Sequence, residues 1–152
     1  MYFDLSINIK RPPADVFAFL RDKDKYPQKP GSPVLVLEKT TPGPAGVGTR
    51  YREVVQMLPF LRGEMRSEVT RFDRGERLEE VFEGVGMRGY LAYRFVTEDG
   101  GTKLIQQEIL HMKGLLKIFS PIVKLTLSRQ LWKRLEGLKE VLEGGWVVNS
   151  QG

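Results

Sequence analysis

The stretch SPIVKLTLSRQLWKRLEGLKEVLEGG, residues 120–145, decides the fold. Ser120-Pro121 supplies the capping residue and first-turn proline with which helices begin, and Gly144-Gly145 supplies a stop. Because its leucines recur at helical spacing, this stretch predicts one long helix over residues 121–143. The rest of the chain must cover its apolar stripe, formed by Leu127, Leu131, Leu135, Leu138 and Leu142.

The chain before this helix is mostly a succession of strands. Residues 3–9 alternate apolar and polar side chains, a period of two that indicates a strand with one buried face. Pro12-Pro13 ends that strand, and residues 14–21 have the spacing of a short amphipathic helix. Residues 23–33 indicate a loop. Further strands, one pair of them joined by the hairpin signal Glu98-Asp99-Gly100-Gly101, are expected at residues 34–39, 50–58, 61–72, 77–83, 88–97 and 103–112.

This order predicts an α+β fold. A curved antiparallel sheet of six or seven strands should wrap around the long C-terminal helix, with a short helix after the first strand. The length of 152 residues suits one domain, which we assign to residues 1–145, followed by a frayed tail at 146–152. Since a single helix cannot fill the hollow of such a sheet, we expect an internal cavity.

The amino-acid composition and motifs exclude several kinds of chemistry. The chain has no cysteine, which excludes disulfides, thiolate catalysis and cysteine-based metal sites. Gly46-Val47-Gly48 precedes a strand and not a helix, so it is a turn and not a dinucleotide-binding loop. We expect no metal and no cofactor. The N-terminus lacks the features of a secretion signal, and no stretch has the roughly 20 apolar residues of a spanning helix, so a cytoplasmic protein is expected.

Several short motifs follow one another in a characteristic order along the chain. They are the opening segment 9–22, with Pro13, Val16, Phe17, Leu20 and Asp22; the glycine-rich Gly46-Val47-Gly48-Thr49; Glu68-Val69-Thr70-Arg71-Phe72; Tyr93-Arg94-Phe95 followed by Gly100-Gly101-Thr102; and, in the last helix, Leu135, Leu138-Lys139 and Leu142-Glu143.

In their order and spacing these motifs resemble the START/Bet v 1-like superfamily, in its polyketide cyclase/dehydrase (SRPBCC) branch. The resemblance covers roughly residues 3–143 and implies a helix-grip fold with an internal cavity. Most such domains bind apolar small molecules or lipids, while a minority catalyse cyclisation or dehydration of polyketides, so the resemblance implies the cavity more firmly than a reaction. We therefore predict a carrier or sensor for an apolar small molecule or lipid. The alternatives are an enzyme of the aromatase/cyclase or dehydratase kind, and an interaction module that uses a basic segment.

The candidate site residues are side chains that share strand or helix faces with apolar neighbours. A polar group such as Glu53 or Glu108 at the mouth of an apolar cavity could orient a ligand, although a partly solvated strand face is the alternative interpretation. For an enzyme, the candidate acid–base groups are Tyr93, Glu108 and His111, the only histidine, which would pair with one of the other two across the cavity. The candidate ligand-binding residues are Phe17, Tyr51, Glu53, Met57, Met65, Tyr93, Gln106, Glu108, Leu131 and Leu135.

Positive charge is concentrated in one segment. Between residues 111 and 134 every charged side chain is basic, which gives +6 there against +5 for the whole chain and leaves −1 elsewhere. Within residues 113–124 lysines alternate with apolar residues, which suggests a flap over the cavity or contact with an anionic membrane. The alternative is a core helix whose lysines reach out to water. Nucleic acid is not expected as a partner, because Phe119 and Trp132 have the spacing of core residues.

Overall fold

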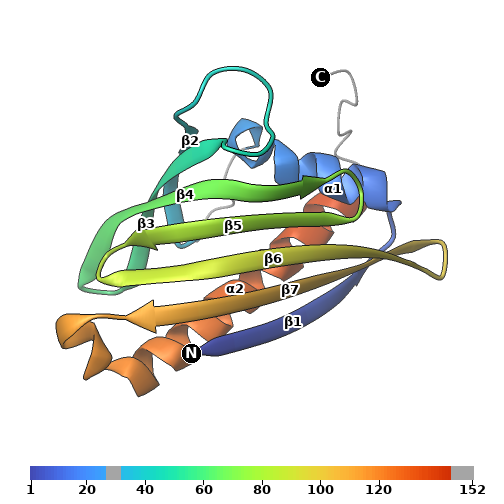
Figure 1. Cartoon of the computed structure of the whole chain (residues 1–152). Coiled ribbons are helices and arrows are strands. Elements are labelled where there is room, and N and C mark those ends of the chain that lie inside the picture. Colours follow the sequence, from blue (N-terminus) through green and yellow to red (C-terminus); the bar gives the residue numbers. More distant parts are fainter. Residues whose placement is uncertain (27–31, 145–152) are drawn as a thin grey trace.

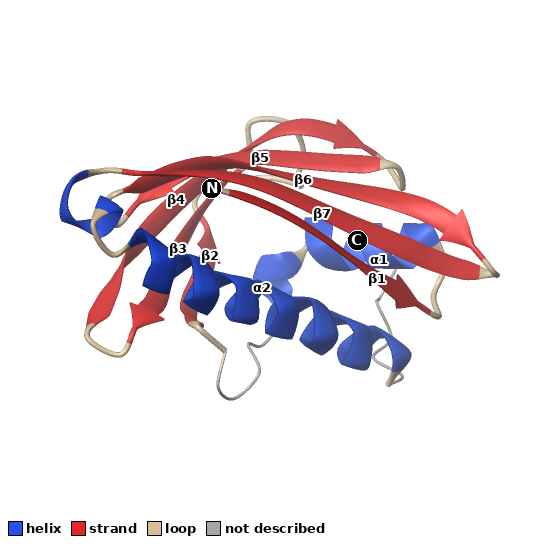
Figure 2. Cartoon of the chain, turned by 90° about the horizontal axis from the view of Figure 1, so that it is seen from below, coloured by secondary structure: helices blue, strands red, loops and turns tan. Residues whose placement is uncertain are grey.

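A curved sheet and a long helix enclose the centre of the molecule (Figures 1 and 2). The computed structural model describes residues 1–26 and 32–144, apart from the side chain of Met57. Helix α2 (Ser120–Glu143) crosses the concave face of the sheet, and α1 (Pro13–Arg21) packs against β6 and β7. The strands are β1 (Tyr2–Ile9), β2 (Val34–Lys39), β3 (Arg50–Leu58), β4 (Leu61–Asp73), β5 (Arg77–Gly84), β6 (Met87–Glu98) and β7 (Gly101–Met112).

The sheet has seven antiparallel strands in the order β1-β7-β6-β5-β4-β3-β2. Each strand from β2 to β7 pairs with its neighbour in sequence, whereas β1 pairs with β7. In that last pair Tyr2 lies opposite Ile109 and Ile9 lies opposite Thr102. The N-terminal ammonium of Met1 extends the pairing by donating to the carbonyl of Leu110 at 2.9 Å. Strands β1 and β2 are therefore the two edges of the sheet.

The sequence predicted this architecture, and the structure confirms the α+β helix-grip fold with its long C-terminal helix. The loop expected over residues 23–33 contains one short turn of 3-10 helix, η1 (Lys23–Lys25), and a second, η2 (Gly114–Lys117), precedes α2. The predicted tail at residues 146–152 lies outside the described part of the chain.

Three irregularities help to bend the sheet around α2. The register shifts in β2 between Val34 and Val36, in β3 between Gln56 and Leu58, and in β4 between Val69 and Arg71. An extra residue on one strand increases the local twist and bends the strand. The resulting curvature separates the middle of the sheet from the helix, which leaves space between them.

One face of α2 and one face of the sheet make the core. The buried residues of α2 are Val123, Leu131, Leu135, Leu138 and Leu142. At the α1 end, the ring of Phe17 makes edge-to-face contacts with Phe72 and Phe95, at centroid distances of 5.1 and 5.3 Å. Phe17 is therefore a packing residue that holds α1 on the sheet.

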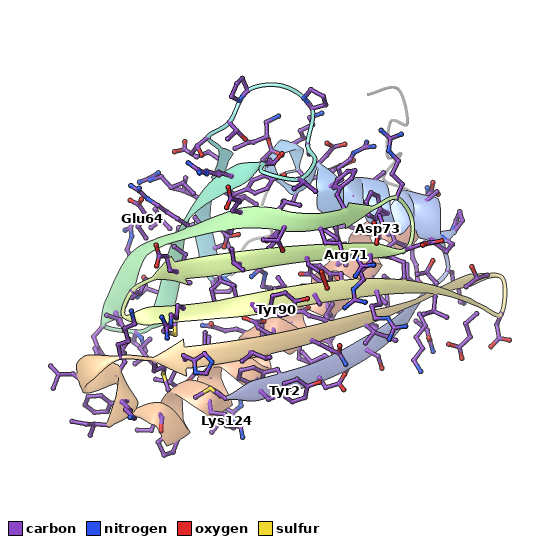
Figure 3. All side chains as sticks on the ribbon, in the orientation of Figure 1. Tyr2, Glu64, Arg71, Asp73, Tyr90 and Lys124 are labelled. Atoms are coloured by element: carbon purple, nitrogen blue, oxygen red, sulfur yellow. The ribbon has the colours of Figure 1, made fainter. Side chains whose placement is uncertain are left out.

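The convex face of the sheet is charged and faces solvent. Arginine–glutamate pairs cross its strands, with Arg50 3.1 Å from Glu68 and Arg52 3.1 Å from Glu64. Glu64, Arg71 and Tyr90 project from this face in Figure 3. Because alternate residues of a strand point to opposite faces, the residues between them supply the concave wall.

Candidate functional site

A cavity of about 360 Å³ lies between the concave face of the sheet and α2. Its volume falls in the range of pockets that hold small molecules. The sequence-based expectation of an internal cavity is thus confirmed. Most of its wall is apolar, with contributions from Phe19, Leu20, Leu37, Val55, Met65, Phe82, Met87, Leu91, Leu127, Leu131 and Leu138.

Three charged residues form an ion-paired group on this wall. The ammonium of Lys23 lies 2.9 Å from a carboxylate oxygen of Glu80 on β5 and 3.8 Å from one of Glu53 on β3. The same ammonium lies 4.4 Å from the ring centroid of Tyr51. Glu80 is almost fully buried, so this pairing is needed to hold its charge inside the protein. One lysine is thus shared between two carboxylates.

A second polar group contains Tyr93 on β6, Glu108 on β7 and Arg134 on α2, all of which line the cavity. Solvent can reach part of each side chain, and most of all that of Arg134, as expected for groups that line a hollow and do not fill it. Desolvation lowers the pKa of Arg134, but the nearby Glu53, Tyr93 and Glu108 together raise it above its ordinary value. Arg134 is therefore a guanidinium fixed in its charged form beside the cavity.

Glu108 is the cavity group that titrates near neutral pH. Its removal from water raises its pKa from 4.5 to about 7, even though Arg134 and a hydrogen bond from Gln106 at 3.3 Å act to lower it. Desolvation also raises the pKa of the Tyr93 hydroxyl, which keeps that group protonated at neutral pH. The cavity thus offers a cation and two groups that can donate a proton in a hydrogen bond.

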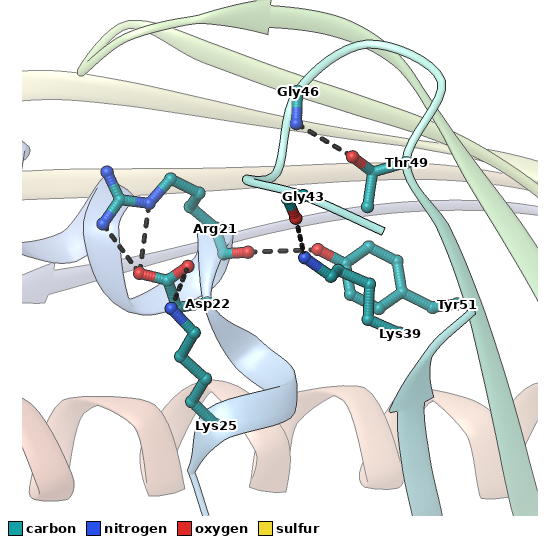
Figure 4. A network of polar contacts seen from close by, with 8 residues as sticks. All are labelled: Arg21, Asp22, Lys25, Lys39, Gly43, Gly46, Thr49 and Tyr51. Atoms are coloured by element: carbon teal, nitrogen blue, oxygen red, sulfur yellow. Dashed lines mark hydrogen bonds and ion pairs between the residues drawn. The ribbon is translucent and has the colours of Figure 1, made fainter. Parts of the chain in front are cut away.

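The chain after α1 is held in place by polar contacts, shown in Figure 4. The hydroxyl of Tyr51 donates to the carbonyl of Arg21 at 3.1 Å. The Arg21 guanidinium in turn pairs with Asp22 at 2.7 Å, and Lys25 lies 3.5 Å from the same carboxylate. These contacts fix the segment that carries Lys23 to the cavity wall.

The structure brings together most of the residues predicted from sequence. Phe17 and Tyr51 are the exceptions, because they lie in the core and do not line the cavity. Their prediction as lining residues is therefore wrong. The side chain of Met57 lies outside the described part of the chain. The residues that do line the cavity are Glu53, Met65, Tyr93, Gln106, Glu108, Leu131 and Leu135.

His111 is placed wrongly by the sequence-based hypothesis. It lies opposite Arg88 in the sheet, is exposed, and faces the convex side of β7. Because it is three residues from Glu108 in an alternating strand, the two side chains point to opposite faces. His111 therefore cannot pair with Glu108 or Tyr93 across the cavity.

The structure contradicts one of the two interpretations of the basic segment, that of a core helix whose lysines reach out to water. Leu115, Ile118, Phe119, Ile122 and Leu125 are exposed, as is Trp132, so the core interpretation of Phe119 and Trp132 is wrong. Lys113, Lys117 and Lys124 are exposed among them. Phe60, in the turn between β3 and β4, is 80% exposed at the same end of the sheet. We call the exposed residues between 113 and 125, together with Phe60, the apolar–basic patch; Lys124 is labelled in Figure 3.

A family model described as "Polyketide cyclase / dehydrase and lipid transport" matches residues 2–143. The chain belongs to this family. Within it, roles in ligand binding and in polyketide cyclase/dehydrase-type reactions are both represented. No protein with a curated description matches the sequence.

Solved structures show the fold of the polyketide cyclase/dehydrase and lipid transport family in other chains. TTHA0849 from Thermus thermophilus has a TM-score of 0.78 at 18% identity, over 96% of this chain and 99% of its own. DR_A0006 from Deinococcus radiodurans has a TM-score of 0.66 at 17% identity, over 95% and 99%. The Bet v 1-like protein Ara h 8.0201 has a TM-score of 0.63 at 17% identity, over 95% of both chains. These likenesses establish the helix-grip fold.

Two further observations concern this member of the family. Within residues 1–26 and 32–144, no group of three or more histidine, aspartate or glutamate side chains is arranged to hold a metal ion. No helix in the same part of the chain is both long and apolar enough to cross a membrane.

Proposed function

We propose that this protein is a carrier or sensor that binds an apolar small molecule or a lipid in the cavity beneath α2. The cavity itself carries the proposal, because it has a volume of about 360 Å³ and a mainly apolar lining, into which polar and charged side chains are set. Burial of apolar ligand surface would provide the affinity, and the polar groups would fix the orientation of the ligand.

Filling part of the cavity should weaken this binding. Gly137 lines the cavity from α2. Leucine at this position would occupy part of the space and also favours a helix more than glycine does. We expect Gly137→Leu to weaken binding of the fluorescent probe 1-anilinonaphthalene-8-sulfonate by about tenfold or more, measured by titration of its fluorescence.

The matched control is Glu136→Leu, which adds the same side chain at the neighbouring, exposed position. It should bind the probe as the parent protein does, and circular dichroism should show both variants folded. Equal binding by the Gly137→Leu protein would place the probe elsewhere on the surface and contradict the proposal.

An enzyme of the cyclase or dehydratase kind is the second candidate, and Glu108 is the observation that favours it. A carboxyl group with a pKa of about 7 is suited to general acid–base catalysis near neutral pH. Native mass spectrometry of the freshly purified protein would reveal a bound small molecule. Recovery of that molecule unchanged after long incubation supports a carrier, whereas conversion that stops in a Glu108→Gln variant supports the enzyme.

The apolar–basic patch supports loading of the carrier at an anionic membrane. Its exposed apolar side chains are interleaved with lysines, and no acidic residue occurs between residues 112 and 135. Lysines near an anionic surface each contribute about 1 kcal/mol, while apolar side chains insert at the interface.

Changing Lys113, Lys117 and Lys124 together to glutamine should therefore weaken binding to vesicles that contain phosphatidylserine. At about 1 kcal/mol for each lysine, the loss of vesicle affinity at low salt is on the order of 100-fold. Added salt should likewise weaken vesicle binding by the parent protein. Co-sedimentation with the vesicles measures both effects, and vesicles of phosphatidylcholine alone should bind poorly.

The control is a triple change of Lys10, Arg74 and Lys103 to glutamine, which removes the same charge from the opposite end of the strands. It should leave vesicle binding nearly unchanged. Equal loss in both triple variants, or retention of the protein on an oligonucleotide but on no vesicle, would contradict a membrane surface.

A further inference from the structure

Arg134 and its neighbour Lys133 are the cavity-lining cations that no carboxylate among the described residues engages. Lys23 is committed to Glu80 and Glu53 at 2.9 and 3.8 Å. By contrast, among the described residues Arg134 makes no hydrogen bond or ion pair, although it lines the cavity. A guanidinium presents several N–H donors in a planar fork that matches a carboxylate. Leu131, Leu135 and Leu138 of the same helix also line the cavity, so apolar walls lie near Arg134.

The balance of charge around the cavity allows one more anion. With Glu108 neutral, the charged lining residues are three cations and two carboxylates, which sum to +1: Lys23, Lys133, Arg134, Glu53 and Glu80. Glu108 faces the same space, and its ionisation would bring the sum to zero. An incoming carboxylate would have the same effect, and the two negative charges would repel each other at close range. A ligand anion and an ionised Glu108 are therefore alternatives.

We propose that the cavity selects ligands that combine an apolar body with a carboxylate, which Arg134 binds while Glu108 is in its neutral form and donates a hydrogen bond to the same carboxylate. This inference rests on the proposed function and narrows its ligand class. The carboxylate provides orientation, and the apolar body extends along the walls formed by residues such as Val55, Met87 and Leu127.

Matched pairs of small molecules test the inference on the full chain. Decanoate and 1-decanol share a flexible body, and 2-naphthoate and 2-naphthol share a planar one, so the two pairs also distinguish a chain-like from a ring-like ligand. We expect at least one acid to bind more tightly than its matched alcohol in isothermal titration calorimetry. Arg134→Gln should lower the affinity for that acid by about 10- to 100-fold and change the affinity for the alcohol by less than about threefold.

The matched control is Arg129→Gln, which removes one positive charge from an exposed position of the same helix that does not line the cavity. It should leave the affinity for the acid nearly unchanged. If the affinity for the acid falls equally in the Arg134→Gln and Arg129→Gln variants, the effect comes from net charge alone. That result would overturn the inference.

Dependence on pH provides the second readout. The groups facing Glu108 are Glu53 from β3, Glu80 from β5, Tyr93 from β6, Arg134 from α2 and Gln106 from its own strand. Because its pKa is about 7, the neutral fraction of Glu108 falls steeply between pH 6 and pH 8. Affinity for the acid should fall by about tenfold over this range, while affinity for the alcohol stays level. Glu108→Gln should remove the dependence.

The outcomes separate the two proposals. Alcohols that bind at least as tightly as their acids, with no response to Arg134→Gln, would overturn the carboxylate inference and leave a carrier of neutral ligands. Failure of all four molecules and of the fluorescent probe to bind the parent protein would overturn the carrier proposal together with the inference.

Discussion

We expect Leu135→Ala to lower the free energy of unfolding by roughly 2–5 kcal/mol, in the range found for buried leucines. Leu135 is only 2% exposed and packs in the core cluster that contains Phe17 and Leu104. Truncation removes apolar contacts with the sheet, and the existing cavity beside Leu135 would become larger, because the surrounding strands and helix cannot collapse into it. Urea unfolding followed by circular dichroism measures the change.

Leu125 offers a matched control on the same helix. It is 56% exposed, so Leu125→Ala should alter the free energy of unfolding by less than about 0.5 kcal/mol, as usual for surface changes. Equal losses at the two positions would show that helix propensity, and not burial against the sheet, determines the contribution of α2. Such a result would contradict the packing described above.

We expect Glu108→Gln to stabilise the protein at alkaline pH and not at acid pH. Burial raises the pKa of Glu108 from 4.5 to about 7 in the folded state. Below pH 4.5 the group is protonated in both folded and unfolded chains, so it causes no penalty. As the pH rises from about 4.5 to about 7, the carboxyl ionises in the unfolded chain but stays protonated in the folded one, so the folded protein loses stability. At pH 8 the loss is on the order of 3 kcal/mol, reduced by whatever solvent reaches the carboxyl.

Because glutamine cannot ionise, the variant should be more stable than the parent at pH 8 and closer to it at pH 4.5. Urea unfolding at a series of pH values between 4.5 and 8 measures the difference. Glu98→Gln, at an exposed position near the β6–β7 turn, should show little of this dependence. A difference between parent and Glu108→Gln that does not change with pH would mean that Glu108 is solvated and has an ordinary pKa.

The fold could be predicted almost completely from sequence because its signals are local. The alternation in residues 3–9, the helical leucines after residue 120 and the turn at Glu98-Asp99-Gly100-Gly101 each depend only on neighbouring positions. Their order leaves one reasonable packing, in which the sheet covers the helix. The bounds of the elements agree with the structure within a few residues.

The site was harder to predict because it depends on the phase of each strand. Because alternate residues of a strand share a face, Glu108 lies on the same face as Gln106 and Leu110, and His111 lies on the other. The alternation alone therefore argues against a cavity role for His111. Glu80 carried a similar signal, since it alternates with Leu78 and Phe82. Arg134 lies next to the leucine stripe, between Leu131 and Leu138, and could have been suspected on that ground.

Other features had no local signal. Lys23 reaches the cavity from a loop, where no periodicity predicts the direction of a side chain. Tyr51 shares its strand face with Glu53 but donates its hydroxyl to Arg21, a contact that depends on the placement of α1. The exposure of the apolar residues around Phe119 likewise depends on how the segment leaves the sheet, and not on its composition.

The pairing of β1 with β7 has a consequence for how the chain folds. Strands β2 to β7 can assemble as successive hairpins, each of which closes only a short loop. The contact of Ile9 with Thr102, and those of Arg11 with Leu142 and Lys10 with Glu143, instead join the two ends of the sequence. Such closures cost the most chain entropy, so we expect them late in the reaction. The meander would then form first as an open half-shell, and the arrival of β1 and α2 would seal the cavity in the final step.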